Sequence, residues 1–394
     1  MDRNTANMDI NVTPELRFPE FTDKWELKTL GELATKVNRR NRQLQVSRVL
    51  TNSATEGVID QNDYFDRDIA VKENTENYHI VDAGDFVYNP RISVSAPVGP
   101  ISVNKIGTGI MSPLYTVFRF HDGYVPFFDQ YFQTKIWHPY LKSVANFGAR
   151  FDRMNITTEG FFNMPIVCPS FAEQKKIAEC LEAEDRMIFA QEQKVESLKA
   201  HKKGLMQQLF PQPGATTPVL RFPGFTGEWE EKKLGECFEI GSGRDYKHLS
   251  TGDIPVYGSG GYMCSVNDYL FNGDSACIGR KGTINNPLLL HGKFWTVDTL
   301  FYTFNYINTS AYFVYLLFQN IDWMKHNEAG GVPSLSKTII NNISVVLPKP
   351  DEQQKIVECI SSIEDIIMNE SKKVEILKNH KKGLMQQLYP QPVK

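Results

Sequence analysis

Residues 352–392 read EQQKIVECISSIEDIIMNESKKVEILKNHKKGLMQQLYPQP, and residues 173–213 read EQKKIAECLEAEDRMIFAQEQKVESLKAHKKGLMQQLFPQP. The two stretches are identical at 24 of 41 positions, with an offset of 179 residues. Self-similarity of this kind marks a duplicated structural unit, and it has to be recognised before any other pattern in the chain is interpreted.

Apolar residues recur in both stretches at alternating spacings of three and four residues, which is the period of a coiled-coil seam. The spacing predicts one long helix over 173–210 and another over 352–389. The predicted seam consists of Ile177, Leu181, Ile188, Val195, Leu198, Leu205 and Leu209 in the first helix, and of Ile356, Ile360, Ile363, Ile367, Val374, Leu377, Leu384 and Leu388 in the second.

A single amphipathic helix of about 55 Å, at 1.5 Å per residue, cannot bury such a stripe by itself. Each helix could pack on its neighbouring globular part, but the matched seams favour an antiparallel pair of the two helices. The charged seam residues Glu184, Lys202, Glu370 and Lys381 would weaken this pair while fixing its register and orientation.

The ends of both helices carry recognisable signals. Ser170 with Glu173 predicts a capping box at the first helix, and Asp351 is expected to cap the second. Pro211 and Pro390 are expected to end the two helices, because proline lacks the backbone N–H that a continuing helix needs.

A second, shorter repeat sets the domain boundaries. Residues 14–33, PELRFPEFTDKWELKTLGEL, and 218–237, PVLRFPGFTGEWEEKKLGEC, share 13 of 20 positions at an offset of 204. Between the repeats lie two dissimilar stretches, the first block (34–172) and the second block (238–351). The predicted organisation is a flexible N-terminus (1–13), a first globular domain (14–172), a first helix (173–210), a linker (211–219), a second globular domain (218–351) and a second helix (352–389).

Both blocks contain short runs of Val, Ile, Phe and Tyr bounded by Gly, Asn, Pro and Asp, which predict strands. These runs are 82–88, 98–103 and 114–120 in the first block, and 254–257, 275–278, 294–297 and 300–304 in the second. Helices are expected at 126–145 and 311–325. The fold class is therefore α+β: two globular domains of mixed strands and short helices, separated by two long antiparallel coiled-coil-like helices.

Length and composition bound the function. The chain has 394 residues, of which 41% are hydrophobic and 23% charged, as in ordinary globular proteins. It contains no run of 18 apolar residues and no apolar segment near its start, so neither a membrane span nor a signal peptide is expected. The six cysteines form no C-x-x-C pair and are expected to be free thiols in the cytoplasm.

Catalytic motifs are missing. The sequence contains no phosphate-binding G-x-x-x-x-G-K-[ST] loop, no Asn/Asp-Pro-Pro-Tyr/Phe motif of adenine methyltransferases and no histidine pair at metal-ligand spacing. We therefore expect no catalytic residue, no metal site and no cofactor in this chain.

Polar and basic clusters in the loops of both blocks are the candidate DNA-binding residues. Arginine suits guanine O6 and N7, asparagine suits adenine, and glycine lets the backbone approach a phosphate closely. The alternative is that they are ordinary solvated loops. Arg91 and Arg280 each follow the glycine of a Gly-Asp pair by seven residues, which indicates a shared loop. The candidates are Arg39, Arg40, Arg42, Asn89, Arg91, Ser93, Arg150 and Arg153 in the first block, and Arg244, Tyr246, Lys247, Tyr257, Ser259, Arg280 and Lys281 in the second.

The doubled LRFP-x-F…W…LGE stretch, the doubled EQ-x-KI…KKGLMQQL-(F/Y)-PQP helix and the two dissimilar blocks resemble the specificity subunits of type I restriction–modification systems, over residues 14 to 392. The resemblance implies two target-recognition domains that each read half of a bipartite, asymmetric site in double-stranded DNA, with the helices as spacer. It also implies a non-catalytic subunit. Two modification subunits would supply S-adenosylmethionine-dependent adenine methylation, and two restriction subunits would supply ATP- and Mg-dependent translocation and cleavage.

The residues alone leave other classes of function open. A duplicated rod with variable blocks could be a scaffold that binds other proteins, and salt-dependent, sequence-selective DNA binding would separate the two possibilities. An enzyme with diverged motifs is the third possibility, and binding of S-adenosylmethionine by the isolated chain would support it. The net charge of −3 fits a DNA reader that leaves part of the phosphate neutralisation to its partners.

Overall fold

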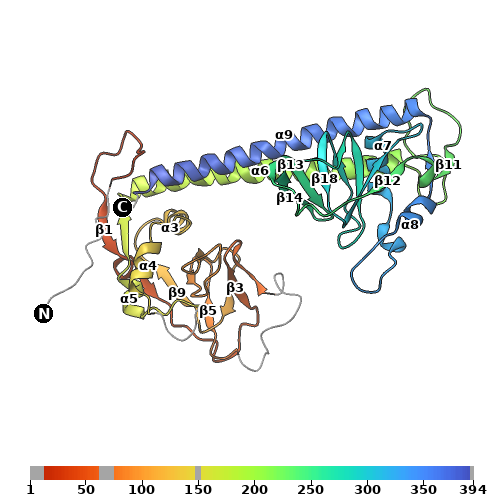
Figure 1. Ribbon diagram of the computed structural model, residues 1–394. Coiled ribbons are helices and arrows are strands. Elements are labelled where there is room, and N and C mark those ends of the chain that lie inside the picture. The colour runs from red at the N-terminus through yellow and green to blue at the C-terminus, as the bar shows by residue number, and fades with distance from the viewer. Residues whose placement is uncertain (1–12, 62–74, 147–151, 391–394) are drawn as a thin grey trace. The chain divides into compact units, whose positions relative to one another are not determined.

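The computed structural model describes residues 13–61, 75–146 and 152–390, and Figure 1 labels its elements. The chain divides into two compact units. The first comprises the residues up to Ala190 together with those from Val374 onward, and the second is Gln191–Lys373. Residues 1–12 of the predicted flexible N-terminus lie outside the described residues.

The first unit is built around four antiparallel strands in the order β2-β9-β6-β7, with three two-stranded pairs, β1–β10, β3–β4 and β5–β8. Its strands are β1 (Glu26–Thr29), β2 (Ala34–Lys36), β3 (Leu50–Ser53), β4 (Gly57–Asp60), β5 (His79–Val81), β6 (Phe86–Tyr88), β7 (Ile101–Val103), β8 (Gly109–Met111), β9 (Thr116–Phe120) and β10 (Pro165–Cys168). Its short helices are α1 (Leu30–Leu33), α3 (Val125–Phe132), α4 (His138–Val144) and α5 (Thr158–Phe162).

The second unit contains two four-stranded sheets, in the orders β12-β19-β16-β17 and β14-β13-β18-β15, and the pair β11–β20. Its strands are β11 (Glu230–Lys233), β12 (Glu239–Ser242), β13 (Thr251–Gly258), β14 (Gly261–Val266), β15 (Phe271–Asn272), β16 (Ser275–Gly279), β17 (Leu288–Leu290), β18 (Lys293–Thr296), β19 (Leu300–Phe304) and β20 (Ser344–Leu347). Its short helices are η2 (Leu234–Glu236), α7 (Ala311–Asn320), η3 (Trp323–His326) and α8 (Lys337–Asn342).

The chain is thus a mixed α and β protein, and the strands expected in both blocks form close to their predicted positions. The two expected short helices are each interrupted. Pro139 is the second residue of α4, where its fixed φ starts a new helix, so the segment 126–145 forms α3 and α4. Ile321 adopts an extended backbone, so the segment 311–325 forms α7 and the 3-10 turn η3.

The first unit is held together by an aromatic core. The rings of Phe120 and Phe128 stack with centroids 3.9 Å apart. Ile177 and Leu181 of the first long helix join this core, and so does Tyr389, whose hydroxyl donates to the Phe127 carbonyl at 3.1 Å. Burying large apolar side chains of this kind contributes about 1.5–3 kcal/mol each.

The second unit repeats this arrangement with different residues. Phe210 stacks on Phe313 with centroids 5.6 Å apart, and Ile356 and Ile360 pack in the same core. In both units the long helices therefore supply part of the core of the globular block.

The constant stretches form the same local structure twice. In the first unit Glu26 of β1 pairs with Cys168 of β10, and in the second Glu230 of β11 pairs with Leu347 of β20. These positions differ by the repeat offsets of 204 and 179, so the strand register is retained between the two halves.

A buried ion pair is also repeated. Arg17 Nε lies 2.7 Å from Glu173, and Arg221 Nε lies 2.7 Å from Glu352. The glutamate side chains are only 1% and 3% exposed, so each pair ties the LRFP stretch to the start of a long helix.

The long helices are α6 (Phe171–Leu209) and α9 (Pro350–Leu388), each of 39 residues. Both begin two residues before the predicted start. The backbone N–H of Glu173 donates to Ser170 Oγ at 3.4 Å, but the Glu173 carboxylate binds Arg17, so only half of the predicted capping box forms. Asp351 lies inside the first turn of α9 and does not cap it.

The seam positions of α6 and α9 are all buried or half-buried. Within the first unit, Lys381 of α9 contacts Asp185 of α6 at 2.6 Å. Within the second unit, Lys202 contacts Glu364 and Gln191 contacts Glu370. In the second unit the partner number falls as the α6 number rises, so the two helices run antiparallel. The first unit agrees, because Ile177 and Leu181 share a core with Leu388, beyond Lys381.

Neither the long helices nor any shorter helix among the described residues is apolar over enough length to cross a membrane.

Candidate nucleic-acid interface

Four loops of the second unit converge near Thr299. The backbone N–H of Arg280 donates to the Thr299 carbonyl at 2.8 Å, and that of Ser259 donates to Thr299 Oγ1 at 3.4 Å. The Arg244 N–H donates to the Thr296 carbonyl at 2.8 Å, and the Val297 N–H to the Tyr257 carbonyl at 2.9 Å. Candidates that lie far apart in the sequence, Arg244, Tyr257, Ser259 and Arg280, are thereby brought into one loop cluster.

Glycine is required where these loops touch. A Cβ atom on Gly243 would lie 1.9 Å from the Val297 carbonyl oxygen, and one on Gly279 would lie 2.0 Å from that of Thr283. Both distances are far below contact, so the neighbouring Arg244 and Arg280 depend on these glycines for their positions.

A cleft of about 570 Å³ opens beside this cluster. Three of its lining residues are cationic, Arg280, Lys281 and Lys337, and one is acidic, Asp298. Arg280 and Lys337 each lie 5.9 Å from the centre of the Phe301 ring, within cation–π range. Ser242, Ser334, Leu335 and Ser336 complete the lining.

Lys337 was not among the candidates predicted from sequence. It is the first residue of a short helix and stands in no basic cluster. The folding of α8 onto β12 brings it beside Arg280, and no local sequence signal indicates that contact.

Other candidates of the second unit contribute to structure. Tyr246 packs against the apolar cluster that contains Trp295 and Val297, and a hydrogen bond with Cys264 raises the pKa of its phenol. Tyr257 packs edge-on against Tyr262, with ring centroids 6.1 Å apart. Lys247 is exposed in the turn that follows Arg244.

In the first unit the corresponding cluster contains two arginines. Arg91 and Arg153 face each other in an antiparallel bridge, with the Ile92 N–H donating to the Asp152 carbonyl at 3.0 Å. Asn89 and Ser93 build this loop, because Asn89 Oδ1 accepts from the Arg91 N–H and Ser93 Oγ accepts from the Ala96 N–H. Their side chains hold the arginine in place and are not free to face a ligand with these atoms.

The same bridge recurs in the second unit, between Lys281 and Ser334. The Gly282 N–H donates to the Pro333 carbonyl at 2.9 Å, as that of Ile92 does to Asp152. Arg91 therefore corresponds to Lys281. The predicted match between Arg91 and Arg280 is off by one residue. It rested on an equal distance from a preceding glycine, and this count differs by one residue from the equivalence that the backbone bridges give.

The predicted cluster at 39–42 is divided. Arg39 forms an ion pair with Asp82 at 2.9 Å, Arg40 donates to the Asn77 carbonyl at 2.6 Å, and Arg42 is exposed. Burial, with the nearby charges of Arg40 and Lys36, lowers the pKa of His79 to about 4. Arg150 lies outside the described residues.

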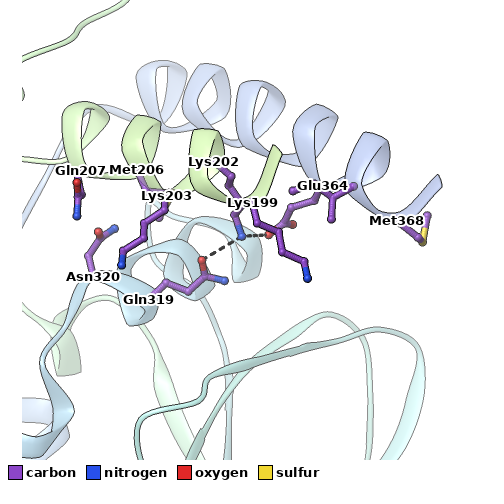
Figure 2. Close-up of a pocket in the computed structure, with 10 residues that line it drawn as sticks. Lys199, Lys202, Lys203, Met206, Gln207, Gln319, Asn320, Glu364 and Met368 are labelled. Carbon is purple, nitrogen blue, oxygen red and sulfur yellow. Dashed lines mark hydrogen bonds and ion pairs between the residues drawn. The ribbon is translucent and has the colours of Figure 1, made fainter. Parts of the chain in front are cut away.

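A seam lysine connects the long helices to the block in each unit. Lys202 contacts Glu364 of α9 and Gln319 of α7, the latter at 3.2 Å, beside a cavity of about 510 Å³ (Figure 2). In the first unit Lys381 contacts Asp185 at 2.6 Å and Gln133 at 3.4 Å. Lys202 and Lys381 are 179 residues apart, the repeat offset, so the same tie forms twice from equivalent positions.

The outer faces of the long helices carry exposed apolar side chains at equivalent positions. Met187 and Phe189 on α6 are 47% and 62% exposed, and Ile366 and Met368 on α9 are 44% and 49% exposed. Each α9 residue follows its α6 counterpart by 179 positions. The same two positions are therefore exposed and apolar in both halves of the repeat.

Within residues 13–61, 75–146 and 152–390, no group of three or more His, Cys, Asp and Glu side chains is arranged to hold a metal ion.

Comparison with known proteins identifies a domain and a fold. Residues 226–378 match the family of the type I restriction modification DNA specificity domain. A specificity subunit of the type I restriction enzyme MjaVIII from Methanocaldococcus jannaschii is 25% identical over 268 residues. The match covers 57% of this chain and 61% of that relative, so it spans about three fifths of the relative's length.

Two solved structures share the fold. The S subunit of a type I restriction–modification system from M. genitalium aligns with a TM-score of 0.57 at 16% identity, covering 97% of this chain and 100% of the other. A chain from a structure of type I restriction–modification complex assembly aligns with a TM-score of 0.57 at 15% identity, covering 94% and 98%. The chain therefore carries a type I restriction modification DNA specificity domain at residues 226–378 and is a relative of the specificity subunits of type I restriction–modification systems.

Proposed function

We propose that the chain is the sequence-specific DNA-binding subunit of a type I restriction–modification complex. Each unit reads one half of a bipartite, asymmetric target in double-stranded DNA. One observation carries the proposal: the β1–β10 and β11–β20 pairs share their register and both units share an ion pair, yet the basic loops of the two units differ. Arg91 faces Arg153 in one unit, whereas Lys281 faces Ser334 in the other. Two different readers on one frame are what an asymmetric bipartite target requires.

The chain itself is proposed to be non-catalytic. Adenine methylation and restriction are assigned to two modification and two restriction subunits, which would hold S-adenosylmethionine, ATP and Mg. Met187, Phe189, Ile366 and Met368 support such partners only by their repetition, because exposed apolar side chains stand at equivalent positions of both long helices. Their repetition at an offset of 179 fits two copies of one partner.

The long helices are proposed to set the distance between the two half-sites. The ties of Lys202 and Lys381 to the α7 and α3 helices support this role, since they link each globular block to the helix pair through side chains. The complex would work in the cytoplasm, where its DNA lies.

Single-molecule methylome sequencing of a strain with and without the gene tests the proposal. We expect one interrupted, asymmetric adenine-methylated motif to disappear on deletion and to return on complementation. An unchanged methylome in a strain that carries active partner subunits would favour the alternative, a duplicated scaffold that binds other proteins.

A further inference from the structure

A lysine ammonium occupies the same place in both units although different elements provide it. Lys36 is the last residue of β2 and pairs with Phe118 of β9. The residue 204 positions on, three residues past the end of the short repeat, is Ile240 of β12, which pairs with Thr303 of β19. Lysine at this strand position in the first unit is thus replaced by isoleucine in the second.

The helix that faces this strand differs between the units in the opposite sense, with lysine in the second unit. Thr158 is the first residue of α5, after the N-cap Thr157. Lys337 is the first residue of α8, after the N-cap Ser336, and follows Thr158 by the repeat offset of 179. Lysine at this helix position is therefore present in the second unit and absent from the first.

The two side chains span the same gap from opposite sides. Lys36 Nζ reaches Thr158 Oγ1 at 3.1 Å, and Lys337 Nζ reaches the Ile240 carbonyl at 2.7 Å. Each unit therefore keeps one ammonium between the strand and the first turn of the helix. Lys36 is exposed and Lys337 half-buried, and an ammonium has three donors, so one hydrogen bond leaves others for a ligand.

The surroundings of both ammonium groups are cationic. Lys337 lines the cleft with Arg280 and Lys281. Lys36 is close enough to His79, together with Arg40, to help lower the pKa of that imidazole. A group retained in place while the loops around it differ fits a ligand feature that both half-sites share. In DNA that feature is the phosphodiester backbone.

We propose that Lys36 and Lys337 are equivalent phosphate-contacting residues, one in each unit, which bind the DNA backbone irrespective of base sequence. The proposal rests on the proposed DNA-binding function and adds to it a division of labour. The ammonium groups hold the backbone, while the loops that differ between the units read bases.

The salt dependence of DNA binding by the full-length chain tests this inference. The probe is a fluorescent 30-base-pair duplex of random sequence, titrated between 50 and 200 mM salt. Each phosphate contact contributes about 0.9 to the slope of log affinity against log salt. Lys36→Met and Lys337→Met should each lower the magnitude of this slope by about 0.9. Between 50 and 200 mM salt, the loss of affinity of each variant should therefore be about 3.5-fold smaller than that of the wild type. Lys325→Met, an exposed lysine of η3, is the matched control and should leave the slope unchanged.

A double variant that moves the lysine from the strand to the helix gives the more specific test. Lys36→Ile combined with Thr158→Lys transplants the second unit's arrangement into the first, and it should restore the slope that Lys36→Ile alone loses. If the lysine only braces the strand against the helix, its replacement should lower the unfolding midpoint and leave the slope of log affinity against log salt unchanged. Should a Met variant fail to fold, Lys→Gln keeps a donor without the charge and should still lower the slope, whereas Lys→Arg should preserve it.

The outcomes separate the two claims. A wild-type chain that binds DNA, with folded variants of unchanged slope, overturns the phosphate assignment alone. Loss confined to one base sequence overturns it as well, because that result marks a base contact. A folded wild-type chain with no affinity for DNA at low salt overturns the proposed function and, with it, this inference.

Discussion

At the scale of single residues, Arg280 is the side chain of the second unit best placed to read a base. It is exposed, lines the cleft and lies over the Phe301 ring. Arg280→Ala should weaken recognition at one half-site and leave the other unchanged. A bidentate contact between arginine and guanine carries about 1–3 kcal/mol of discrimination. Binding measured on duplexes altered in one half-site at a time checks this, and an equal loss on every sequence would contradict base reading.

Glu370 is a charged residue on the seam of the helix pair, and its ionisation is coupled to stability. Hydrogen bonds from Lys373, Gln191 and Lys194 lower the pKa of its carboxyl to about 2, from 4.5. The carboxylate therefore stabilises the fold above pH 4.5, and this contribution is lost as the pH falls from 4.5 toward 2. The destabilisation caused by Glu370→Gln should be constant above pH 5 and shrink between pH 4.5 and 3. Urea midpoints across this range measure it, and a difference independent of pH would refute the account.

At the scale of elements, the seam of the long helices could be read from sequence because its period is local, and the seven predicted runs of both blocks form strands, whereas strands such as β3, β5 and β14 were not predicted. The basic site was harder to predict. Strand pairing, and not the distance from a glycine, makes Arg91 equivalent to Lys281. The lysine that Lys36 provides in one unit comes from Lys337 in the other, so neither aligned position has the same residue type in both units. Contacts between elements distant in sequence decide both, so no local pattern carries them.

The helix pair predicts how spacing can be engineered. Gln191 and Glu370 meet across the pair, so inserting one heptad after each keeps the seam in register. Seven residues add about 10.5 Å and nearly two whole turns. The gap between half-sites should therefore grow by about three base pairs, at about 3.4 Å each. Methylome motifs report the gap, and an active complex with an unchanged gap would show that the helices do not set it.

At the scale of the molecule, Gln191 and Glu370 are equivalent repeat positions, 179 residues apart, and they contact each other across the antiparallel helix pair. A half-length protein, 1–214, would place glutamine against glutamine when it dimerises. It would also regain the pairing of Asp185 with Lys202, which is equivalent to Glu364 with Lys202. We expect an antiparallel two-fold dimer that directs methylation of an interrupted palindrome.

The other half gives the contrast. Residues 215–394 would bring two Glu370 carboxylates together, so this half should dimerise more weakly, and Glu370→Gln should strengthen its dimer. Sedimentation of both halves at tens of micromolar measures the difference. A folded first half that stays monomeric, or a second half that pairs equally well without the substitution, would contradict the arrangement.

The central claim is that two independent readers share one frame, and exchange of the first block tests it most directly. Residues 34–172 are replaced by the corresponding block of another such subunit, which leaves both repeats intact, and the adenine methylome is sequenced. The account predicts that the first half-site changes while the second half-site and the gap remain the same. A change in the second half-site, or loss of methylation by a folded and assembled protein, would contradict it.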